Sequence, residues 1–384
     1  MIEADYNIQQ DNYRWTDLKH LNKADFVAPT VAVQEKLLAE KLPLLQSQLA
    51  ENSLVLLNGK FCKNLSNLDR RIVIWEKNQQ PAATPAEIQI KAQLSQLDYY
   101  KQASLIVQEN REVVSDLVLY LPEQVQIEGR VKLIALNTTS AQPRYTSVSL
   151  AIVLAKQAKL ELEENLLTES VEVNPLSAAP YWNNLICHYY LAEAASLKLK
   201  RLQNETKTAL HFSSSFFYQK ANSILQFTLL NYGGATVRNE IFNILDGPGA
   251  ESKIYGLSVA EAKQHFDNFL CVDHRASHCS SYQRFKGVYA DTSVGAFQGS
   301  ITVRAETQGN TANQSCANLL LSKTARVNVL PQLKIWSKDV KCNHGATVGY
   351  LNEEEIFYMC SRGIPLKVAQ ELQVEAFKNE IEHK

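Results

Sequence analysis

Short runs of β-forming residues with alternating apolar and polar positions dominate the chain from about residue 117 onward. Clear examples are VQIEGRVKLIAL (125–136), AKLELE (158–163), ASLKLK (195–200) and FKGVYA (285–290). Alternation with a period of two is the pattern of a strand that buries one face, and long helical stripes are nearly absent here. We therefore predict one large all-β core over residues 117–350.

Two architectures fit this pattern equally well, a β-sandwich and a parallel β-helix. Strands that begin with small residues, such as AKLEL, ASLKL and ANSILQF, suit stacked rungs in which the chain turns sharp corners. The spacing between these strands is not constant, so no clean repeat identifies a β-helix. The pattern alone leaves the choice open.

Residues 1–116 are predicted to form a mainly helical region that contains one β-hairpin. VAVQEKLLAEKL (31–42) has an apolar stripe that Pro43 interrupts, and residues 86–116 return to a mixed helical pattern. In SLVLLNGKFC (53–62), an Asn-Gly pair separates two apolar runs, which is a strong hairpin signal.

Residues 351–384 are predicted to form a C-terminal helical region of two helices. Asn352 can cap the first helix, Gly363 suits its end, and Pro365 suits the first turn of the second. The second helix carries one apolar stripe, made of Val368, Ala369, Leu372, Ala376, Phe377 and Ile381. The stripe either packs on the β core or offers a docking surface, and the sequence leaves both open.

The composition argues against nucleic-acid binding and membrane binding. The 384 residues are 45% apolar and 21% charged, with 39 basic and 40 acidic side chains, so no net field favours nucleic acid or an anionic membrane. The first residues are polar and charged, and no apolar stretch reaches the roughly 18 residues of a spanning helix. The seven scattered cysteines are typical of reduced thiols. We expect a cytoplasmic protein.

The segment VKCNHGATVG (340–349) carries the most informative side chains, Cys342 and His344. On a strand, residues i and i+2 share a face, about 6–7 Å apart. Thiolate and imidazole both bind iron, but an iron–sulfur cluster needs about four ligands. The pair is therefore half of a metal site that another chain completes, or else a buried thiol beside a hydrogen-bonded core histidine.

A second candidate metal cluster is CVDHRASHC, which holds Cys271, His274, His278 and Cys279. Zinc sites use these ligand types, although a closed site usually draws its ligand pairs from two separated segments. The alternative is that Cys271 ends a buried strand and the histidines occupy a polar turn. The sequence lacks a phosphate-binding loop, because GPGAESK (247–253) only superficially resembles one, and it lacks a dinucleotide fingerprint and a nucleophile elbow.

The C-terminal residues resemble the SufB/SufD family of iron–sulfur cluster assembly proteins. PQLKIWSKDVKCNHGATVGYLNEEEIFYMCSRGI (331–364) follows the family pattern P-x-L-x-I, D-V-K-C-S-H-G-A-T-V-G and S-R-G-I, with Asn343 where Ser is usual. GAFQGSITV (295–303) and ANQSCANLLLS (312–322) resemble two further strands of the family. Toward the N-terminus only VLLNGKF (55–61) resembles it. The SufD branch is favoured, since the extra cysteine that SufB carries before this motif is missing here.

The resemblance implies a right-handed parallel β-helix core flanked by N-terminal and C-terminal helical regions. It also implies a scaffold subunit rather than an enzyme. In the family, SufD pairs with SufB, and each offers its C-terminal helical region to SufC, an ABC-type ATPase. The docking residues expected on this chain are Glu354, Phe357, Tyr358, Arg362, Leu372 and Phe377.

By the same resemblance, Cys342 and His344 face SufB, which adds a Cys and a Glu to a transient iron or iron–sulfur site. Two points stay open, whether a reduced flavin binds in the complex and whether the isolated chain forms a homodimer. The alternative function is a β-helix carbohydrate-active enzyme. It requires an exposed carboxylate cluster in a long groove, together with export, and the sequence indicates neither.

Overall fold

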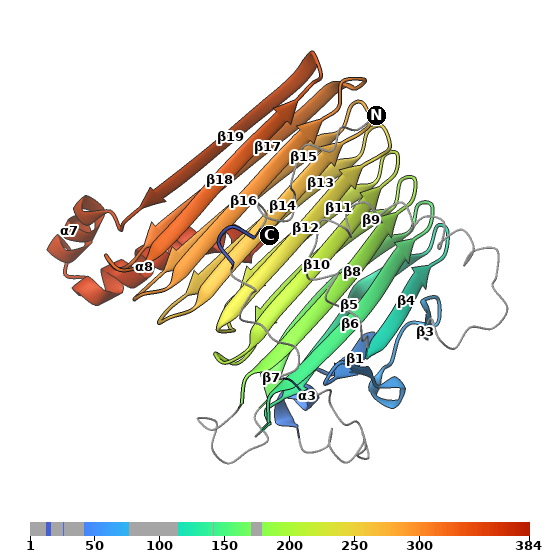
Figure 1. Cartoon of the computed structure of the whole chain (residues 1–384), viewed down its shortest axis with the longest axis horizontal. Coiled ribbons are helices and arrows are strands. Elements are labelled where there is room, and N and C mark those ends of the chain that lie inside the picture. Colours follow the sequence, from blue (N-terminus) through green and yellow to red (C-terminus); the bar gives the residue numbers. More distant parts are fainter. Residues whose placement is uncertain (1–12, 17–25, 27–41, 77–113, 141, 170–178) are drawn as a thin grey trace.

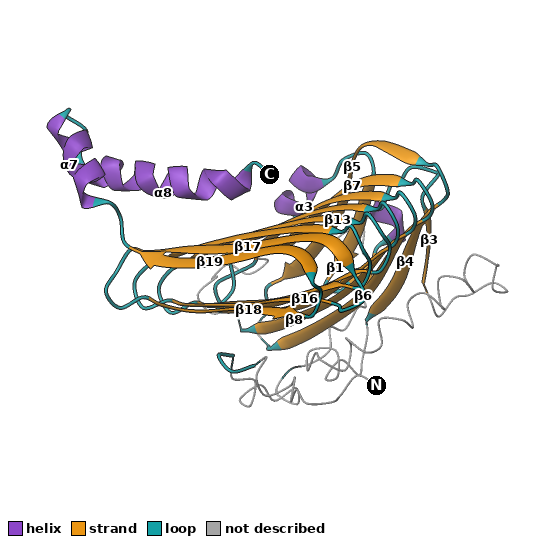
Figure 2. Cartoon of the chain, turned by 90° about the horizontal axis from the view of Figure 1, so that it is seen from above, coloured by secondary structure: helices purple, strands orange, loops and turns teal. Residues whose placement is uncertain are grey.

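The computed structural model describes residues 13–16, 26, 42–76, 114–140, 142–169 and 179–384. Their strands form two stacked sheets that wind together as a solenoid (Figures 1 and 2). Apart from β2, odd-numbered strands build one sheet, and apart from β3, even-numbered strands build the other, because the chain crosses between the sheets after almost every strand. The fold is a parallel β-helix, and the sandwich alternative is excluded.

The first sheet has ten strands. In spatial order they are β19 (Asp339–Gly349), β17 (Gln308–Leu320), β15 (Ser280–Tyr289), β13 (Glu251–Ala260), β11 (Ile224–Asn231), β9 (Ser196–Asn204), β7 (Lys159–Glu169), β5 (Gln126–Thr138), β1 (Ser53–Leu57) and β2 (Lys60–Phe61).

The second sheet has nine strands and faces the first across the interior. In spatial order they are β18 (Arg326–Ile335), β16 (Val294–Val303), β14 (His265–His274), β12 (Thr236–Leu245), β10 (Leu210–Gln219), β8 (Tyr181–Leu191), β6 (Arg144–Leu154), β4 (Ser115–Leu121) and β3 (Val73–Glu76). Strand pairings in both sheets are parallel, apart from β1–β2 and β3–β4.

Parallel register aligns side chains in columns, and alternate residues of every strand face the interior. The column through Leu199, Phe227 and Ile254 is one example, and all three side chains are buried. For this reason the alternating apolar and polar positions in the sequence predict the strands well, although they do not predict how the strands stack. The register also explains the missing repeat, because successive partners such as Lys159, Ser196 and Ile224 are unevenly spaced along the chain.

The interior is not uniformly apolar. Arg201 and Glu164 form a fully buried ion pair, with 2.6 Å between Arg201 Nε and Glu164 Oε2. The Tyr189 hydroxyl donates a hydrogen bond to the other oxygen of Glu164, also at 2.6 Å. A buried pair of this kind is strongly destabilising when only one partner is removed.

The predicted hairpin is present, with β1 and β2 paired antiparallel around Asn58 and Gly59, both at positive φ. Pro43, expected to interrupt a helix over 31–42, opens the short helix α3 (Pro43–Gln48), and a 3₁₀ turn follows at Lys63–Leu65. The helical predictions over 31–42 and 86–116 lie almost entirely outside the described residues. Strands β1 and β3 extend the two sheets before residue 117, and the domain boundaries stay a prediction.

The chain ends in two helices, α7 (Glu353–Ser361) and α8 (Leu366–Glu382). The predicted cap is confirmed, because the Asn352 side chain accepts hydrogen bonds from the backbone N–H groups of Glu354 and Glu355. Gly363, at φ 88°, follows the end of α7, and Pro365 precedes α8. Figure 2 shows α8 lying along the outer face of the ten-stranded sheet and α7 projecting beyond the solenoid.

Candidate functional site at the open end of the solenoid

Both sheets stop at the same end of the solenoid, with β18 and β19 as their last strands (Figure 1). β18 pairs only with β16 and β19 only with β17, so one backbone edge of each strand has no ladder partner in the described part of the chain. Edge strands of this kind are templates for pairing with another chain.

The side chains of this last rung expose a cross-section of the interior. Val329, Leu333 and Ile335 of β18 face inward and are only half-buried, as is Val340 of β19. Solenoids need a cap or a partner at each end, because a terminal rung has no neighbour to cover its apolar side chains. The open end is therefore suited to cover by another protein surface.

Cys342 and His344 lie on this rung and share its inward face. In the register of β17 and β19, Cys342 is opposite Ala312 and His344 is opposite Gln314, and both β17 residues are buried. The predicted side-by-side placement is confirmed. Cys342 packs against the cluster of Ile301, Val303 and Ala312, whereas His344 is exposed.

The environment of Cys342 favours the protonated thiol over the thiolate. Partial burial raises the pKa of the Cys342 thiol above its usual value, and a backbone hydrogen bond from Ala312 lowers the pKa in part. Binding to a metal replaces that proton, since the thiolate is the ligand.

Within the described residues, no three His, Cys, Asp or Glu side chains are close enough to bind one metal ion. Cys316 faces the interior one rung deeper, but it is buried, and desolvation raises the pKa of its thiol to about 12. Asn318 Nδ2 lies 3.3 Å from its sulfur. Cys316 is a core thiol, so Cys342 and His344 provide only two ligands.

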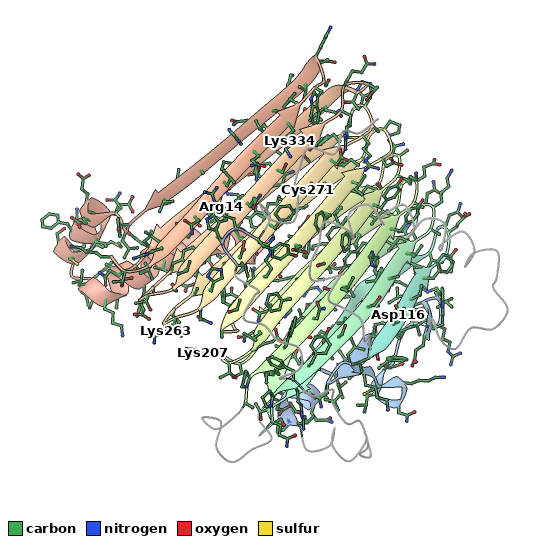
Figure 3. The ribbon with its side chains drawn as sticks, in the orientation of Figure 1. Arg14, Asp116, Lys207, Lys263, Cys271 and Lys334 are labelled. Atoms are coloured by element: carbon green, nitrogen blue, oxygen red, sulfur yellow. The ribbon has the colours of Figure 1, made fainter. Side chains whose placement is uncertain are left out.

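The second candidate cluster does not form a site. Cys271 packs on the outer face of the nine-stranded sheet, where Figure 3 labels it, whereas His274 is buried and its Nε2 lies 2.8 Å from Ser281 Oγ. His278 occupies an exposed turn at φ 59°, and Cys279 belongs to the interior apolar cluster. The metal interpretation is wrong because Cys271 and His274 are three residues apart on one strand and therefore point to opposite faces.

The C-terminal half of α8 is anchored to the ten-stranded sheet. Ile381 is fully buried in a cluster with Leu230, Tyr255 and Leu257. Only the apolar stripe of the second C-terminal helix indicated this contact beforehand.

Lys286 makes the main polar contact of this joint. Its Nζ donates to the Phe377 carbonyl oxygen at 3.0 Å, lies 2.7 Å from Glu380 Oε1, and is 4.0 Å from the centre of the Phe377 ring. Burial lowers the pKa of Lys286, and the hydrogen bond to Glu380 opposes that shift. Phe377, predicted to dock a partner, is thus used within the chain. A lysine at an outward position of the apolar run FKGVYA was the signal available in the sequence.

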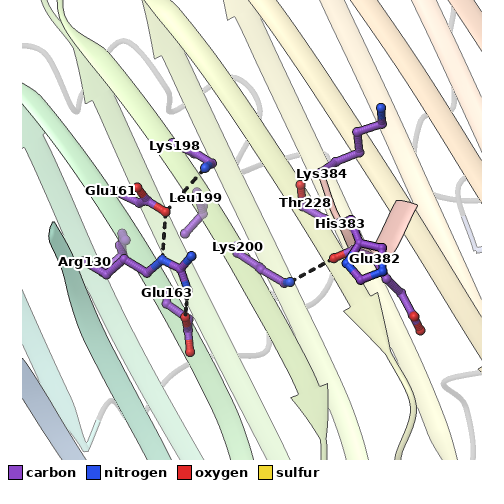
Figure 4. A pocket seen from close by; sticks show the side chains of 11 residues that line it. Arg130, Glu161, Glu163, Lys198, Leu199, Lys200, Thr228, Glu382, His383 and Lys384 are labelled. Carbon is purple, nitrogen blue, oxygen red and sulfur yellow. Dashed lines mark hydrogen bonds and ion pairs between the residues drawn. The ribbon is translucent and has the colours of Figure 1, made fainter. Parts of the chain in front are cut away.

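The end of α8 is held over a small charged cleft of about 230 Å³, seen in Figure 4. Lys200 Nζ donates to the Glu382 carbonyl oxygen at 3.0 Å, and Gln226 Nε2 donates to the Lys384 carbonyl oxygen at 2.8 Å. Cationic and amide donors are favourable at a helix C-terminus. Arg130 in the cleft is paired with Glu161 at 2.9 Å. These contacts make the cleft a structural joint.

The other predicted docking residues lie on α7 and the first half of α8 and are exposed. Phe357 exposes 74%, Tyr358 60% and Leu372 48% of its surface. Glu354, Tyr358 and Leu372 line a shallow open groove of about 600 Å³ between the two helices. Arg362 stacks over the Tyr358 ring at 5.3 Å. Large apolar side chains clustered in this way are typical of an interaction surface.

Residues 136–377 match the family described as SUF system FeS cluster assembly, SufBD core domain. An iron–sulfur cluster assembly SufBD family protein of Synechocystis is 25% identical over 383 residues, covering 97% of this chain and 82% of the relative. The iron–sulfur cluster assembly protein SufD of Escherichia coli is 32% identical over 193 residues, covering 50% of this chain and 45% of the relative. The chloroplastic protein ABCI7 of Arabidopsis thaliana is 27% identical over 273 residues, covering 69% of this chain and 56% of the relative.

None of the helices in the described ranges combines the length and the apolar character needed to cross a membrane.

Proposed function

Because the chain belongs to the SufBD family of the SUF system for iron–sulfur cluster assembly, we propose that it is a non-catalytic, SufD-type scaffold subunit. In this role it pairs with a SufB-like subunit through the open end of the solenoid and docks a SufC-like ATPase on its C-terminal helices. The family assignment leaves no support for the carbohydrate-active alternative. The observation that carries the proposal is the placement of Cys342 and His344 together at the end of the β-helix where, among the described residues, no further strand pairs with β18 or β19.

Pairing with a second β-helix suits the open end for two reasons. The free edge of β19 can extend the ten-stranded sheet into the partner, since main-chain hydrogen bonds then continue across the boundary. The half-buried apolar side chains of β18 and β19 become fully buried against the partner's terminal rung. Apolar burial is worth roughly 25 cal/mol per Å² before the losses of association.

The metal role follows from this arrangement. Cys342 and His344 supply a soft thiolate and an imidazole, and the SufB-like subunit supplies the remaining ligands of a transient iron or iron–sulfur species. The species is cargo in transit rather than a resident cofactor. A two-ligand site on each chain holds metal well only in the assembled complex, because the ligand count is complete only there.

The exposed surface of α7 and α8 fits the ATPase. Phe357, Tyr358 and Leu372 provide apolar anchors, and Glu354 and Arg362 provide charges beside them. Aromatic and arginine side chains dominate the affinity of many interfaces. A movement of the docked ATPase is passed to β13 and β15 through the Ile381 and Lys286 contacts, and so to the strands that lead to the open end.

The test is anaerobic co-expression of the chain with SufB-like and SufC-like partners, followed by iron and acid-labile sulfide analysis of the purified complex. His344→Ala is expected to lower the iron content severalfold without dissociating the complex. Asn343→Ala is the matched control, since Asn343 lies on the same strand with its side chain on the other face. Unchanged iron and sulfide in His344→Ala would contradict the proposed role.

A further inference from the structure

A buried glutamine lies directly beneath His344 in the column of inward-facing side chains. Gln314 is the register partner of His344 and exposes only 4% of its surface. Neither Oε1 nor Nε2 of its amide has a hydrogen-bond partner among the described residues. One rung deeper, Gln283 is fully buried and likewise has no partner for either amide atom within the described ranges.

Packing does not account for this choice of residue. A buried polar group without a hydrogen bond costs on the order of 1–3 kcal/mol. The next side chains in the same column are Ile254 and Phe227, which fill the interior without such a penalty. An unsatisfied buried amide in a native protein calls for an explanation, such as a ligand or an ordered solvent molecule.

The amide of Gln314 extends across the interior toward the nine-stranded sheet. A Cβ atom at Gly299 would lie only 1.5 Å from Gln314 Nε2, so the amide occupies the space that a glycine leaves free. The register partner of Gly299 on the last rung is Pro331. The amide therefore forms a polar floor one rung below the open end, beneath the face that carries Cys342 and His344.

We propose that Gln314 is a positioning residue of the half-site. Its amide donates a hydrogen bond to a small anionic ligand, namely sulfide, on the iron bound by Cys342 and His344. This inference rests on the proposed function and deepens it. A hydrogen bond to a charged acceptor is about twice as strong as a neutral one, and such donors stabilise sulfur ligands of iron. Gln314 itself does not ligate the metal.

The experiment uses the co-expressed complex, stripped of metal anaerobically and titrated with Co²⁺ and then with sodium sulfide. Thiolate-to-cobalt absorption reports metal binding, and its change on adding sulfide reports the second ligand. The variant is Gln314→Met, which keeps the volume and removes the donors. The matched control is Gln283→Met, the same substitution in the same column one rung deeper.

We expect Gln314→Met to weaken sulfide binding about 10- to 100-fold, the usual effect of losing an outer-shell partner, and Gln283→Met to leave it unchanged. Both variants should unfold at or above the wild-type temperature, because each removes a buried amide without a partner. Wild-type sulfide affinity in Gln314→Met would overturn the inference. Equal weakening in both variants would also overturn it, since the effect would then reflect interior polarity in general.

Cys342→Ala and His344→Ala separate this inference from the proposed function. Cys342→Ala is expected to abolish the thiolate-to-cobalt absorption, and His344→Ala is expected to weaken metal binding. If they do so while Gln314→Met binds sulfide normally, only the role of Gln314 fails. If neither variant changes cobalt binding, the half-site itself fails.

Discussion

Replacement of Ile381 by alanine tests whether α8 is attached to the solenoid by its C-terminal half alone. Ile381 has no exposed surface and fills a cluster with Leu230, Tyr255 and Leu257. Truncating a buried isoleucine to alanine typically costs 2–5 kcal/mol, because the cavity is only partly refilled. The loss should appear as local opening of the helix, since the remaining anchors of α8 are polar contacts at its end.

The assay is native-state hydrogen exchange of the α8 amides. Where exchange follows the opening equilibrium, a loss of 2 kcal/mol makes exchange about 30-fold faster, and each further loss of about 1.4 kcal/mol makes it about tenfold faster again. The interior strands should keep their protection. The matched control is Leu372→Ala on the same helix, where the side chain is 48% exposed. Half-exposed positions away from the core usually change stability by about 0.5 kcal/mol or less.

The two variants should then separate anchoring from docking. Leu372→Ala should keep α8 protected but weaken binding of the proposed SufC-like partner about tenfold, as loss of an interface anchor does. Ile381→Ala should keep the docking surface but disconnect it from β13 and β15. Unchanged exchange in Ile381→Ala, or equal loss of protection in both variants, would refute the assignment of the anchor.

Three further predictions concern stability. Glu164→Gln should lower the free energy of unfolding by about 3–5 kcal/mol in denaturant titration, because it leaves Arg201 charged and uncompensated. The control Glu161→Gln, whose side chain is only half-buried, should change it by less than about 1 kcal/mol. Burial lowers the pKa of His274 to about 4, so the unfolded state binds a proton at a higher pH than the folded state does. Up to about 3 kcal/mol of folding stability should therefore be lost as the pH falls from 6.5 toward 4. His274→Asn should flatten this pH dependence, measured by thermal unfolding at both pH values. Asn352→Ala should destabilise α7 by about 1 kcal/mol, seen as faster amide exchange in its first turn, and equal exchange in both proteins would contradict the cap.

Local chemistry made several elements predictable. The Asn58-Gly59 turn, the Asn352 cap and the stop at Gly363 each depend on one residue's own conformational preference, and the structure has all three. The shared face of Cys342 and His344 follows from the period of a strand. These features need no knowledge of distant parts of the chain.

Features that depend on register could not be predicted in this way. Alternation is the same in a sandwich and in a β-helix, and only the long-range parallel pairing distinguishes them. The candidate metal site around Cys271 does not form because β14 continues through His274, so that Cys271 and His274 point to opposite faces of the sheet. Phe377 was placed on a docking surface because the sequence does not show that Lys286 contacts it. Gln314 was missed since its partner above, His344, becomes a neighbour only in the stacked rungs.

In the proposed complex, another subunit covers the open end of the solenoid at β19. Hydrogen exchange of the amides of Asp339–Gly349, compared in the monomeric chain and in the complex with a SufB-like partner, tests it directly. Amides on the free edge of β19 should exchange rapidly in the monomer and become protected at least tenfold in the complex, while the paired interior strand β11 stays unchanged. Complex formation with no gain of protection along β19 would contradict pairing at this end.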